Sequence, residues 1–331
     1  MAIDWSPLKE LVANSDSFVL TTHTRSDCDA IGSELGLLYA LEALGKRVRI
    51  VNADAPPTHI AFLDAEDRIE VLGEGVTAED VHQADAHVIV DTSAWGQLGQ
   101  MADVFRETPA RRLVIDHHQS SDDLGAVMIK DTEAEACGRL ILEAIDALGV
   151  VLAPAMTAPL FTAIATDTGW FRFPSVTEKT YEAIARLVAC GAKPSAIYQT
   201  LYDQNTAARI RLHGRILQSL SLESGDRVAF GVATEADFAE TGAAQSDTEE
   251  VVNRLLSVAG VEVAALICFM EPGLTKVSLR SRSATDVRPV AEHFGGGGHA
   301  KAAGVRYRGT TDEARAAVLA VIERQMAEQS V

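Results

Sequence analysis

The sequence has few cysteines, and their spacing excludes two kinds of structural site. Four cysteines are scattered over 331 residues, and no two of them form a Cys-x-x-Cys pair. This pattern fits neither a disulfide framework nor a structural zinc site. The first residues also lack a basic segment followed by an apolar core. We therefore expect a protein of the reducing cytoplasm.

Basic residues and long apolar runs are also scarce. The chain has 29 Lys and Arg against 47 Asp and Glu, which gives a formal net charge of −18. This balance argues against a long nucleic-acid track on a generally basic surface. A polyanionic ligand would need locally placed cations, supplied by metal ions or a few arginines. No segment approaches the ~20 unbroken apolar residues of a membrane span, so we expect no membrane partner.

The composition that remains is that of an ordinary globular protein. Hydrophobic residues make up 47% of the chain and charged residues 23%, so disorder is not expected. The length of 331 residues exceeds one typical hydrophobic core. Two domains are therefore expected.

The first part of the chain alternates apolar strands with amphipathic helices. Continuous apolar runs are typical of parallel strands that are covered on both faces, and they occur at 18–22, 47–51, 86–90 and 112–115. Between the first two runs, apolar residues recur at helical spacing from Ile31 to Leu44. Further helices are expected at 133–148, 155–165 and 178–189. The pattern predicts an α/β domain over residues 1–193, with a mainly parallel sheet flanked by helices.

The rest of the chain predicts a linker and a smaller domain. Residues 194–224 remain helical but become more polar, which indicates a helical linker. Strands are expected again at 228–232, 261–269 and 276–280, followed by a helix near 312–327. We therefore predict a smaller C-terminal α/β domain over residues 225–331.

Acidic residues and histidines follow several predicted strands. Ligands bind beyond the carboxyl ends of parallel strands, so one crevice would hold these side chains together. A lone Asp after a strand is usually a helix cap or a turn residue, and the inference therefore depends on the whole set. The set consists of His23, Asp27, Asp29, Asp91, Asp116, His117, His118 and Asp167.

The chemistry of this set indicates a binuclear metal site. Carboxylate oxygens and imidazole nitrogens suit Mn²⁺ or a related first-row ion, with Mg²⁺ or Co²⁺ as alternatives. Two such ions stabilise both the entering and the leaving oxygen of a displacement at phosphorus. At least one carboxylate must then bridge the two ions.

These motifs, in this order, resemble those of the DHH phosphoesterase superfamily, and within it the NrnA-type subfamily with a DHH-associated type 1 C-terminal domain. The resemblance covers nearly the whole chain. It implies that one metal ion is held by His23, Asp27 and Asp91, and the other by Asp29, Asp91, His117 and Asp167. Asp91 would be the bridge. The resemblance also implies that Asp116 orients the histidines and that His118 contacts phosphate or donates a proton.

Two residues depart from the family's first motif, in which Pro and Gly flank the first Asp. Ser26 and Cys28 occupy these positions. Cys28 lies between two expected ligands, and a thiolate there would alter the metal preference. The alternative, which we favour, is a small residue packed under the loop.

The second predicted domain carries candidate phosphate-binding residues. Arg280 and Arg282 lie two residues apart on a predicted strand, so their side chains leave the same face. A Gly-Gly-Gly-Gly-His loop at 295–299 has backbone N–H groups that a phosphate can approach closely. Alone, a glycine run is more often a turn. Together, the two features resemble the family's substrate-binding signature, which implies nucleotide binding by Arg280, Arg282, Gly296, Gly297, Gly298 and His299.

An aromatic run, Trp170-Phe171-Arg172-Phe173, directly follows the motif of Asp167. Aromatic side chains could stack on a base there. Aromatic residues near a sheet usually belong to the core, and we favour that interpretation.

The resemblance implies a metal-dependent phosphoesterase. It would hydrolyse short 5′-phosphorylated oligoribonucleotides to mononucleotides, and 3′-phosphoadenosine 5′-phosphate (pAp) to AMP. The expected partners are short single-stranded RNA or DNA oligonucleotides and pAp-type nucleotides, and a homodimer is left open. A phosphodiesterase for cyclic dinucleotides is the alternative, because the same site chemistry serves both activities in relatives. A non-catalytic nucleotide sensor is a third hypothesis, against which the complete acidic set argues.

Overall fold

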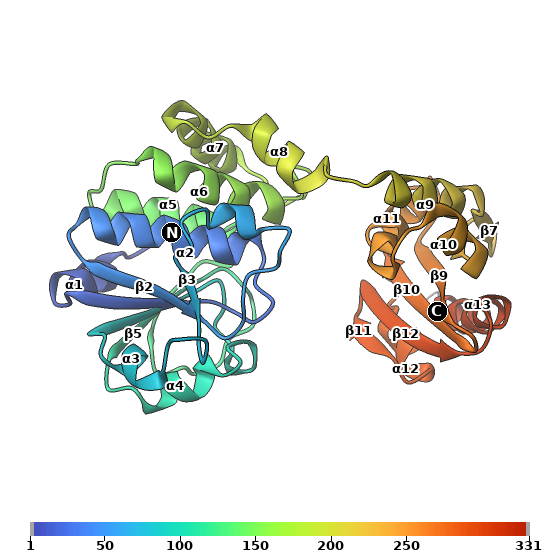
Figure 1. Cartoon of the computed structure of the whole chain (residues 1–331), viewed down its shortest axis with the longest axis horizontal. Helices are drawn as coiled ribbons and strands as arrows, with labels where there is room; N and C mark the ends of the chain where they lie inside the picture. The colour runs from blue at the N-terminus through green and yellow to red at the C-terminus, as the bar shows by residue number, and fades with distance from the viewer. Residues whose placement is uncertain (1–2, 329–331) are drawn as a thin grey trace. The chain divides into compact units, whose positions relative to one another are not determined.

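The computed structural model describes residues 3–328 and divides into two compact units. The first unit ends at Asp203 and the second begins at Gln204. This division falls inside the segment 194–224 that the sequence predicts as a linker. Each unit contains one six-stranded sheet with helices packed on it (Figure 1). The α/β class predicted from the sequence is confirmed.

The sheet of the first unit is entirely parallel, in the order β3-β2-β1-β4-β5-β6. Its four central strands are those that the apolar runs predict. The edge strands β3 and β6 were not predicted, because they are only three and four residues long and mostly half-buried or exposed. The strands are β1 (Ser17–Thr21), β2 (Arg47–Asn52), β3 (Ile69–Val71), β4 (Ala86–Val90), β5 (Arg111–Asp116) and β6 (Val127–Lys130).

Helices cover both faces of this sheet, which explains why its strands are continuously apolar (Figure 1). Phe18 and Leu20 of β1 face the core formed with α1, α2, α5 and α6, whereas Val19 faces the core formed with α3 and α4. The helices of this unit are α1 (Ser6–Ala13), α2 (Cys28–Ala43), α3 (Ala78–His82), α4 (Met101–Glu107), α5 (Cys137–Ala147), α6 (Pro154–Asp167), α7 (Glu178–Cys190) and α8 (Pro194–Tyr202).

Helix α5 begins four residues later than the sequence predicts. The expected start was Glu133, but residues before Cys137 form a turn in which the side chain of Asp131 accepts a hydrogen bond from the N–H of Glu133 and its backbone carbonyl accepts one from the N–H of Ala134. The side chain of Asp131 thus competes with the helix for the N–H of Glu133. As a result, the N-terminus of α5 lies where its free N–H groups reach Asp29.

Two glycines allow α2 and α6 to pack closely. A Cβ atom on Gly32 would lie 2.4 Å from the carbonyl oxygen of Pro159, and one on Gly36 would lie 2.6 Å from Cδ2 of Leu160. Asp29 lies in the first turn of α2, and Asp167 is the last residue of α6. The close packing therefore determines how far apart these two carboxylates lie.

The second unit has a mixed sheet in the order β11-β12-β10-β9-β8-β7, in which only the β8–β9 pair is parallel. One face packs against α12 and α13, and the other packs against α9 and α11 over β8 and β9. Its elements are α9 (Ala207–Gln218), β7 (Ser221–Glu223), β8 (Val228–Ala233), α10 (Glu235–Thr241), α11 (Val251–Leu256), β9 (Val263–Glu271), β10 (Leu274–Ser281), α12 (Arg288–His293), β11 (Gly297–His299), β12 (Ala302–Arg308) and α13 (Thr311–Glu328).

The glycine run does not form the simple loop that the sequence predicts. Gly297, Gly298 and His299 pair with β12 as the short edge strand β11. Glycine has low strand propensity, so sequence reasoning missed this strand. Separately, no helix within residues 3–328 is long and apolar enough to cross a membrane.

We predict that Gly32→Ala destabilises the first unit by about 1–3 kcal/mol, because the new methyl group meets the backbone of α6. All three tryptophans, Trp5, Trp95 and Trp170, lie in that unit, so urea unfolding followed by tryptophan fluorescence reports on it alone. Gly96→Ala is the matched control, because its Cβ would meet nothing within 4 Å. Equal stability of the two variants would show that α2 and α6 can separate without cost.

Candidate metal centre

The candidate residues gather at the carboxyl end of the first sheet. His23 lies two residues after β1, Asp91 directly follows β4, and Asp116 ends β5 with His117 next to it. Strands β1, β4 and β5 are neighbours, and the order of strands reverses between β1 and β4. Ligands bind at this reversal in open α/β sheets. Asp167 reaches the same place from the end of α6.

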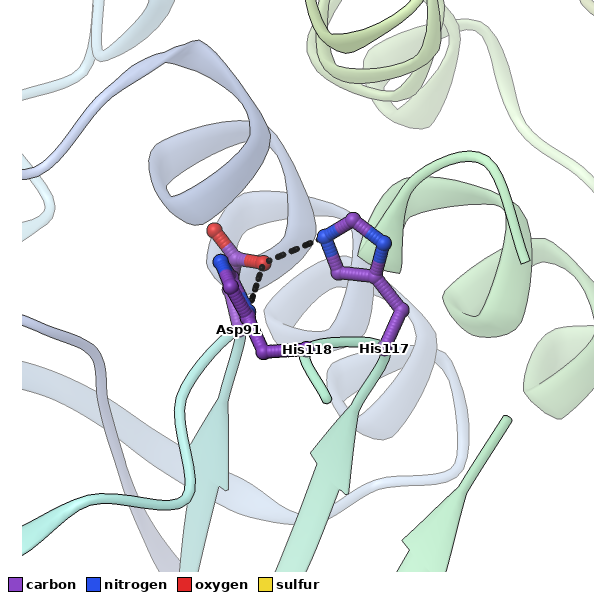
Figure 2. Close-up of side chains that lie close together, drawn as sticks. All are labelled: Asp91, His117 and His118. Carbon is purple, nitrogen blue, oxygen red and sulfur yellow. Dashed lines mark ion pairs between the residues drawn. The ribbon is translucent and has the colours of Figure 1, made fainter. Parts of the chain in front are cut away.

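Asp91 is the centre of the cluster. Its carboxylate is buried, with Oδ2 3.4 Å from Nε2 of His23 and Oδ1 3.4 Å from Nε2 of His117. Figure 2 shows that Oδ1 of Asp91 is paired with both His117 and His118, and Nδ1 of His118 lies 3.7 Å from this oxygen. The backbone of Asp91 is left-handed, with φ +61°, yet its N–H still donates to the carbonyl of Ile115.

Oδ1 of Asp91 is a buried oxygen that accepts no hydrogen bond from residues 3–328. Burying a carboxylate oxygen without a partner is costly, and a bound cation would remove that cost. The surrounding donors, which are carboxylate oxygens and imidazole nitrogens, suit a divalent first-row ion. The site therefore fits the metal ions that the sequence predicts.

Besides Asp91, His117 and His118, which form one group with metal-ligand spacing, two further groups of three side chains flank this oxygen. His23, Asp27 and Asp91 form one group, in which one ligand atom from each residue lies within 4.8 Å of the others. A second group with the same spacing consists of Asp29, His117 and Asp167. His117 joins the groups, since its Nε2 is 3.6 Å from both Asp29 Oδ2 and Asp167 Oδ2. All six predicted metal ligands thus lie together.

The two histidines present the correct nitrogen to these groups. Nδ1 of His23 lies 3.0 Å from the carbonyl oxygen of Thr24, and Nδ1 of His117 lies 3.1 Å from that of Ala134. A carbonyl oxygen only accepts, so each Nδ1 carries the proton that it donates. In the neutral ring each Nε2 then carries the lone pair, and this nitrogen faces the carboxylates, which is how metal-binding histidines are usually oriented.

Backbone N–H groups position the two carboxylates of the first motif. Asp29 is buried and accepts 2.7 Å and 2.8 Å hydrogen bonds from the N–H groups of Cys137 and Gly138, at the start of α5. Asp27 is the N-cap of α2 and accepts from the N–H groups of Asp29 and Ala30. The role of α5 depends on a contact across more than a hundred residues, so no local signal could have revealed it.

Asp116 faces away from the two groups. It is fully buried, accepts a 2.6 Å hydrogen bond from Oγ of Ser93, and lies 3.1 Å from Nζ of Lys130. Its Oδ1 also accepts from Nδ1 of His118 at 2.9 Å. Although burial alone would raise the pKa of Asp116, these donors hold that pKa well below its usual range. Sequence reasoning missed Ser93 and Lys130, because neither belongs to a motif.

The ionisable side chains compensate one another's charge. Burial alone would lower the pKa values of His23 and His117, but their carboxylate neighbours raise them to about 9 and about 10. Burial and the charges of Asp91 and Asp167 raise the pKa of Asp29. Burial also raises the pKa of Asp167 to about 6. Positive charge placed among these carboxylates would favour their ionised forms.

Cys28 is packed in the core, which agrees with the interpretation of Cys28 as a small packed residue rather than a metal ligand. Its side chain belongs to the cluster that α2 forms with the sheet, and burial raises the pKa of its thiol to about 12. The thiol therefore stays protonated near neutral pH and is a poor metal ligand.

The predicted substrate-binding residues lie at one end of the second sheet. Arg280 is half-buried on β10, but Arg282 lies beyond the end of that strand, and its guanidinium donates to the carbonyl of Val258. The expectation that both arginines lie on one strand is therefore wrong, because β10 ends at Ser281. Gly297, Gly298 and His299 are exposed on β11, directly after Gly296.

The aromatic run after Asp167 divides into two parts. Trp170 and Phe171 pack against the core of the first unit, which agrees with the core interpretation. Phe173 is 50% exposed, with its ring against Gly169.

Comparison with known proteins agrees with this arrangement. Residues 17–166 match the DHH family, N-terminal domain, and residues 227–328 match the DHHA1 domain. The chain is 31% identical over 312 residues to a bifunctional oligoribonuclease and PAP phosphatase NrnA of Thermus thermophilus, covering 93% of this chain and 89% of the relative. It is 26% identical to the protein of the same name in Bacillus subtilis, with coverages of 87% and 88%.

Other relatives carry different names. A cyclic-di-AMP phosphodiesterase PdeA of Listeria monocytogenes is 26% identical over 92% of this chain, which spans 47% of that relative. Among solved structures, an exopolyphosphatase-related protein of Bacteroides fragilis superposes with a TM-score of 0.85 at 25% identity, covering 97% of this chain and 95% of that one. An exonuclease RecJ bound to manganese shares the fold, with a TM-score of 0.55 at 16% identity and coverages of 98% and 96%.

The sequence match extends along nearly the whole chain and includes both domains. The motif residues also meet at one end of the first sheet. The chain therefore belongs to the DHH phosphoesterase family.

Proposed function

We propose that this hydrolase cleaves short 5′-phosphorylated oligoribonucleotides to mononucleotides and pAp to AMP. The observation that carries the proposal is Asp91, a buried carboxylate within reach of both ligand groups. Such a carboxylate can bridge two cations, and a pair of cations suits displacement at phosphorus. The NrnA relatives, which this chain matches over most of its length, support the choice of substrates.

In this proposal each group holds one divalent cation. When bound, the cations polarise the phosphoryl oxygens and lower the pKa of a water molecule that attacks phosphorus. His23, Asp27 and Asp91 would hold the first cation, and Asp29, His117 and Asp167, together with Asp91, would hold the second. We infer Mn²⁺ from the mixed nitrogen and oxygen donors, with Mg²⁺ and Co²⁺ as alternatives. The manganese bound to the RecJ neighbour supports this inference.

His118 acts on the substrate in this proposal, rather than as a metal ligand. Its Nδ1 is engaged with Asp116, so Nε2 is the nitrogen available to a phosphate oxygen, and its side chain is 42% exposed. Ser93 and Lys130 hold Asp116 in place, which fixes the imidazole ring. His118 can then stabilise charge on the phosphoryl group or donate a proton to the leaving oxygen.

The alternative substrate is a cyclic dinucleotide. The PdeA relative supports it, but this chain matches only about half of that protein, whereas it matches most of the NrnA relatives. A non-catalytic sensor remains the third hypothesis. It gains no support from the cluster, in which all six predicted metal ligands lie together.

We predict that metal-stripped protein regains activity on pAp and on a 5′-phosphorylated dinucleotide when Mn²⁺ is added. Asp91→Asn should lower both rates by at least roughly 10²-fold, because the bridging charge is lost while the shape is kept. Phosphate and mononucleotide release measure the outcome. Asp103→Asn is the control, since this exposed carboxylate pairs with Arg106 and, among residues 3–328, with no other cation.

Two results would contradict this prediction. Faster cleavage of cyclic di-AMP than of pAp and the dinucleotide would favour the alternative substrate. Tight nucleotide binding without turnover at any Mn²⁺ concentration would favour the sensor.

We predict that substitution of the two adjacent histidines affects different quantities, metal binding for His117 and turnover for His118. His117→Asn should weaken Mn²⁺ binding by more than the roughly 10–100-fold that losing an outer hydrogen-bond partner costs. His118→Asn should leave Mn²⁺ binding unchanged but lower kcat by on the order of 10²–10⁴-fold. Metal titration by calorimetry and steady-state kinetics separate the two. Loss of Mn²⁺ binding in the His118→Asn variant would contradict this prediction and show that His118 is a metal ligand.

We predict that Cys137→Pro weakens Mn²⁺ binding roughly 10–100-fold, because it removes the N–H that orients Asp29. Cys137 is the first residue of α5, where proline is compatible with the helix. Cys137→Ala keeps the N–H and should bind Mn²⁺ normally. Equal affinities of the two variants would show that this hydrogen bond does not position Asp29.

A further inference from the structure

We propose that Lys276 and Arg306 form a second phosphate-binding site in the C-terminal unit, which holds a phosphate of an oligonucleotide away from its reacting end. This inference deepens the proposed function and rests on it. It adds a site that the residues assigned from the family motifs do not include.

The two cations are direct neighbours. Lys276 on β10 pairs with Arg306 on β12 in the antiparallel register, so their side chains leave the same face of the sheet. Like charges directly opposite each other destabilise a sheet. Neither side chain forms an ion pair or a hydrogen bond with any residue from 3 to 328. Unneutralised paired cations are unexpected in a chain with 47 acidic residues, and a bound anion would relieve their repulsion.

Both cations line a cavity of about 520 Å³. Its wall includes Gly295 and Gly296, which follow α12, and Gly304 of β12. A Cβ on Gly296 would lie 2.2 Å from the carbonyl oxygen of Gly304, so this part of the glycine run must pack directly on the strand. The glycines therefore leave the space above the two cations open.

One residue that lines the cavity, Gln245, has a polar atom without a hydrogen bond. Gln245 donates from Nε2 to the carbonyl of Phe269, while its Oε1 is buried and accepts no hydrogen bond from the part of the chain that the structure describes. Met270 supplies apolar surface beside it. A cationic pair, a free acceptor and apolar surface together match a nucleotide, which has a phosphate, amino groups and an apolar base face.

The spacing favours an oligonucleotide over a single nucleotide. Arg280 lies four residues from Lys276 on the same face of β10, which corresponds to about 13 Å along the strand. A ligand that contacts both places must carry phosphates separated by a comparable distance. Of the residues assigned from the family motifs, only Gly296 lines the cavity. The cavity is therefore a separate subsite on the same surface.

The test measures binding without catalysis. The full chain, kept in EDTA so that nothing is hydrolysed, is titrated by calorimetry with a 5′-phosphorylated triadenylate, with pAp and with inorganic phosphate. The double variant Lys276→Gln/Arg306→Gln should bind the triadenylate at least about tenfold more weakly, because charged hydrogen bonds are lost. For the triadenylate, the slope of log K against log salt concentration should be smaller in magnitude by about 1 in the double variant. The affinity of the double variant for pAp should differ from that of the unmodified chain by less than twofold.

Two variants serve as controls. Lys9→Gln/Arg324→Gln removes the same charge from exposed residues outside the cavity and off β10 and β12, and it should bind the triadenylate like the unmodified chain. Arg306→Lys keeps the charge and should retain most of the affinity. Removing two repelling charges should not unfold the sheet, which circular dichroism checks.

Unchanged triadenylate affinity in the double variant would overturn the proposal. An equal loss for the triadenylate, pAp and inorganic phosphate would also overturn it, because the site would then accept any free phosphate. If the unmodified chain binds inorganic phosphate through this pair but binds no oligonucleotide, the anion site stands and the proposed substrate class fails. Kinetics give a second readout, in which KM for the triadenylate rises while kcat and the pAp reaction are unchanged.

Discussion

The crowding of carboxylates at one end of a parallel sheet is the constraint on which the first unit depends. Asp29 and Asp91 are buried there, and their charges raise each other's energy in a medium of low dielectric constant. The fold partly offsets this cost with His117 and with the N–H groups at the start of α5. The remaining deficit of positive charge would favour a bound cation.

The same constraint accounts for much of the surrounding architecture. The parallel sheet brings the ends of β1, β4 and β5 together, and the glycines of α2 bring the end of α6 close enough for Asp167 to join them. Ser93 and Lys130 keep Asp116 ionised on the far side of His118, so the two adjacent histidines differ in what they face. Segments distant in sequence thus contribute single side chains to one rigid arrangement.

The sequence predicted the parts of this arrangement that local patterns encode. Continuous apolar runs revealed the four central strands because both faces of the sheet are covered, and most of the motifs with candidate metal ligands follow a strand, whereas Asp167 ends α6. Short edge strands such as β6 and β11 lack such a pattern. The support of Asp29 by α5 and the path of Arg282 depend on contacts between distant segments, which a single sequence does not show.

The left-handed backbone at Asp91 places a second demand on that position. Glycine, asparagine and aspartate adopt this conformation with little strain, whereas longer or branched residues do not. Of these three, only aspartate carries a charge. Backbone geometry and ligand chemistry therefore select the same residue independently, so few evolutionary replacements can preserve both, and drift at this position should be far more restricted than burial alone would require.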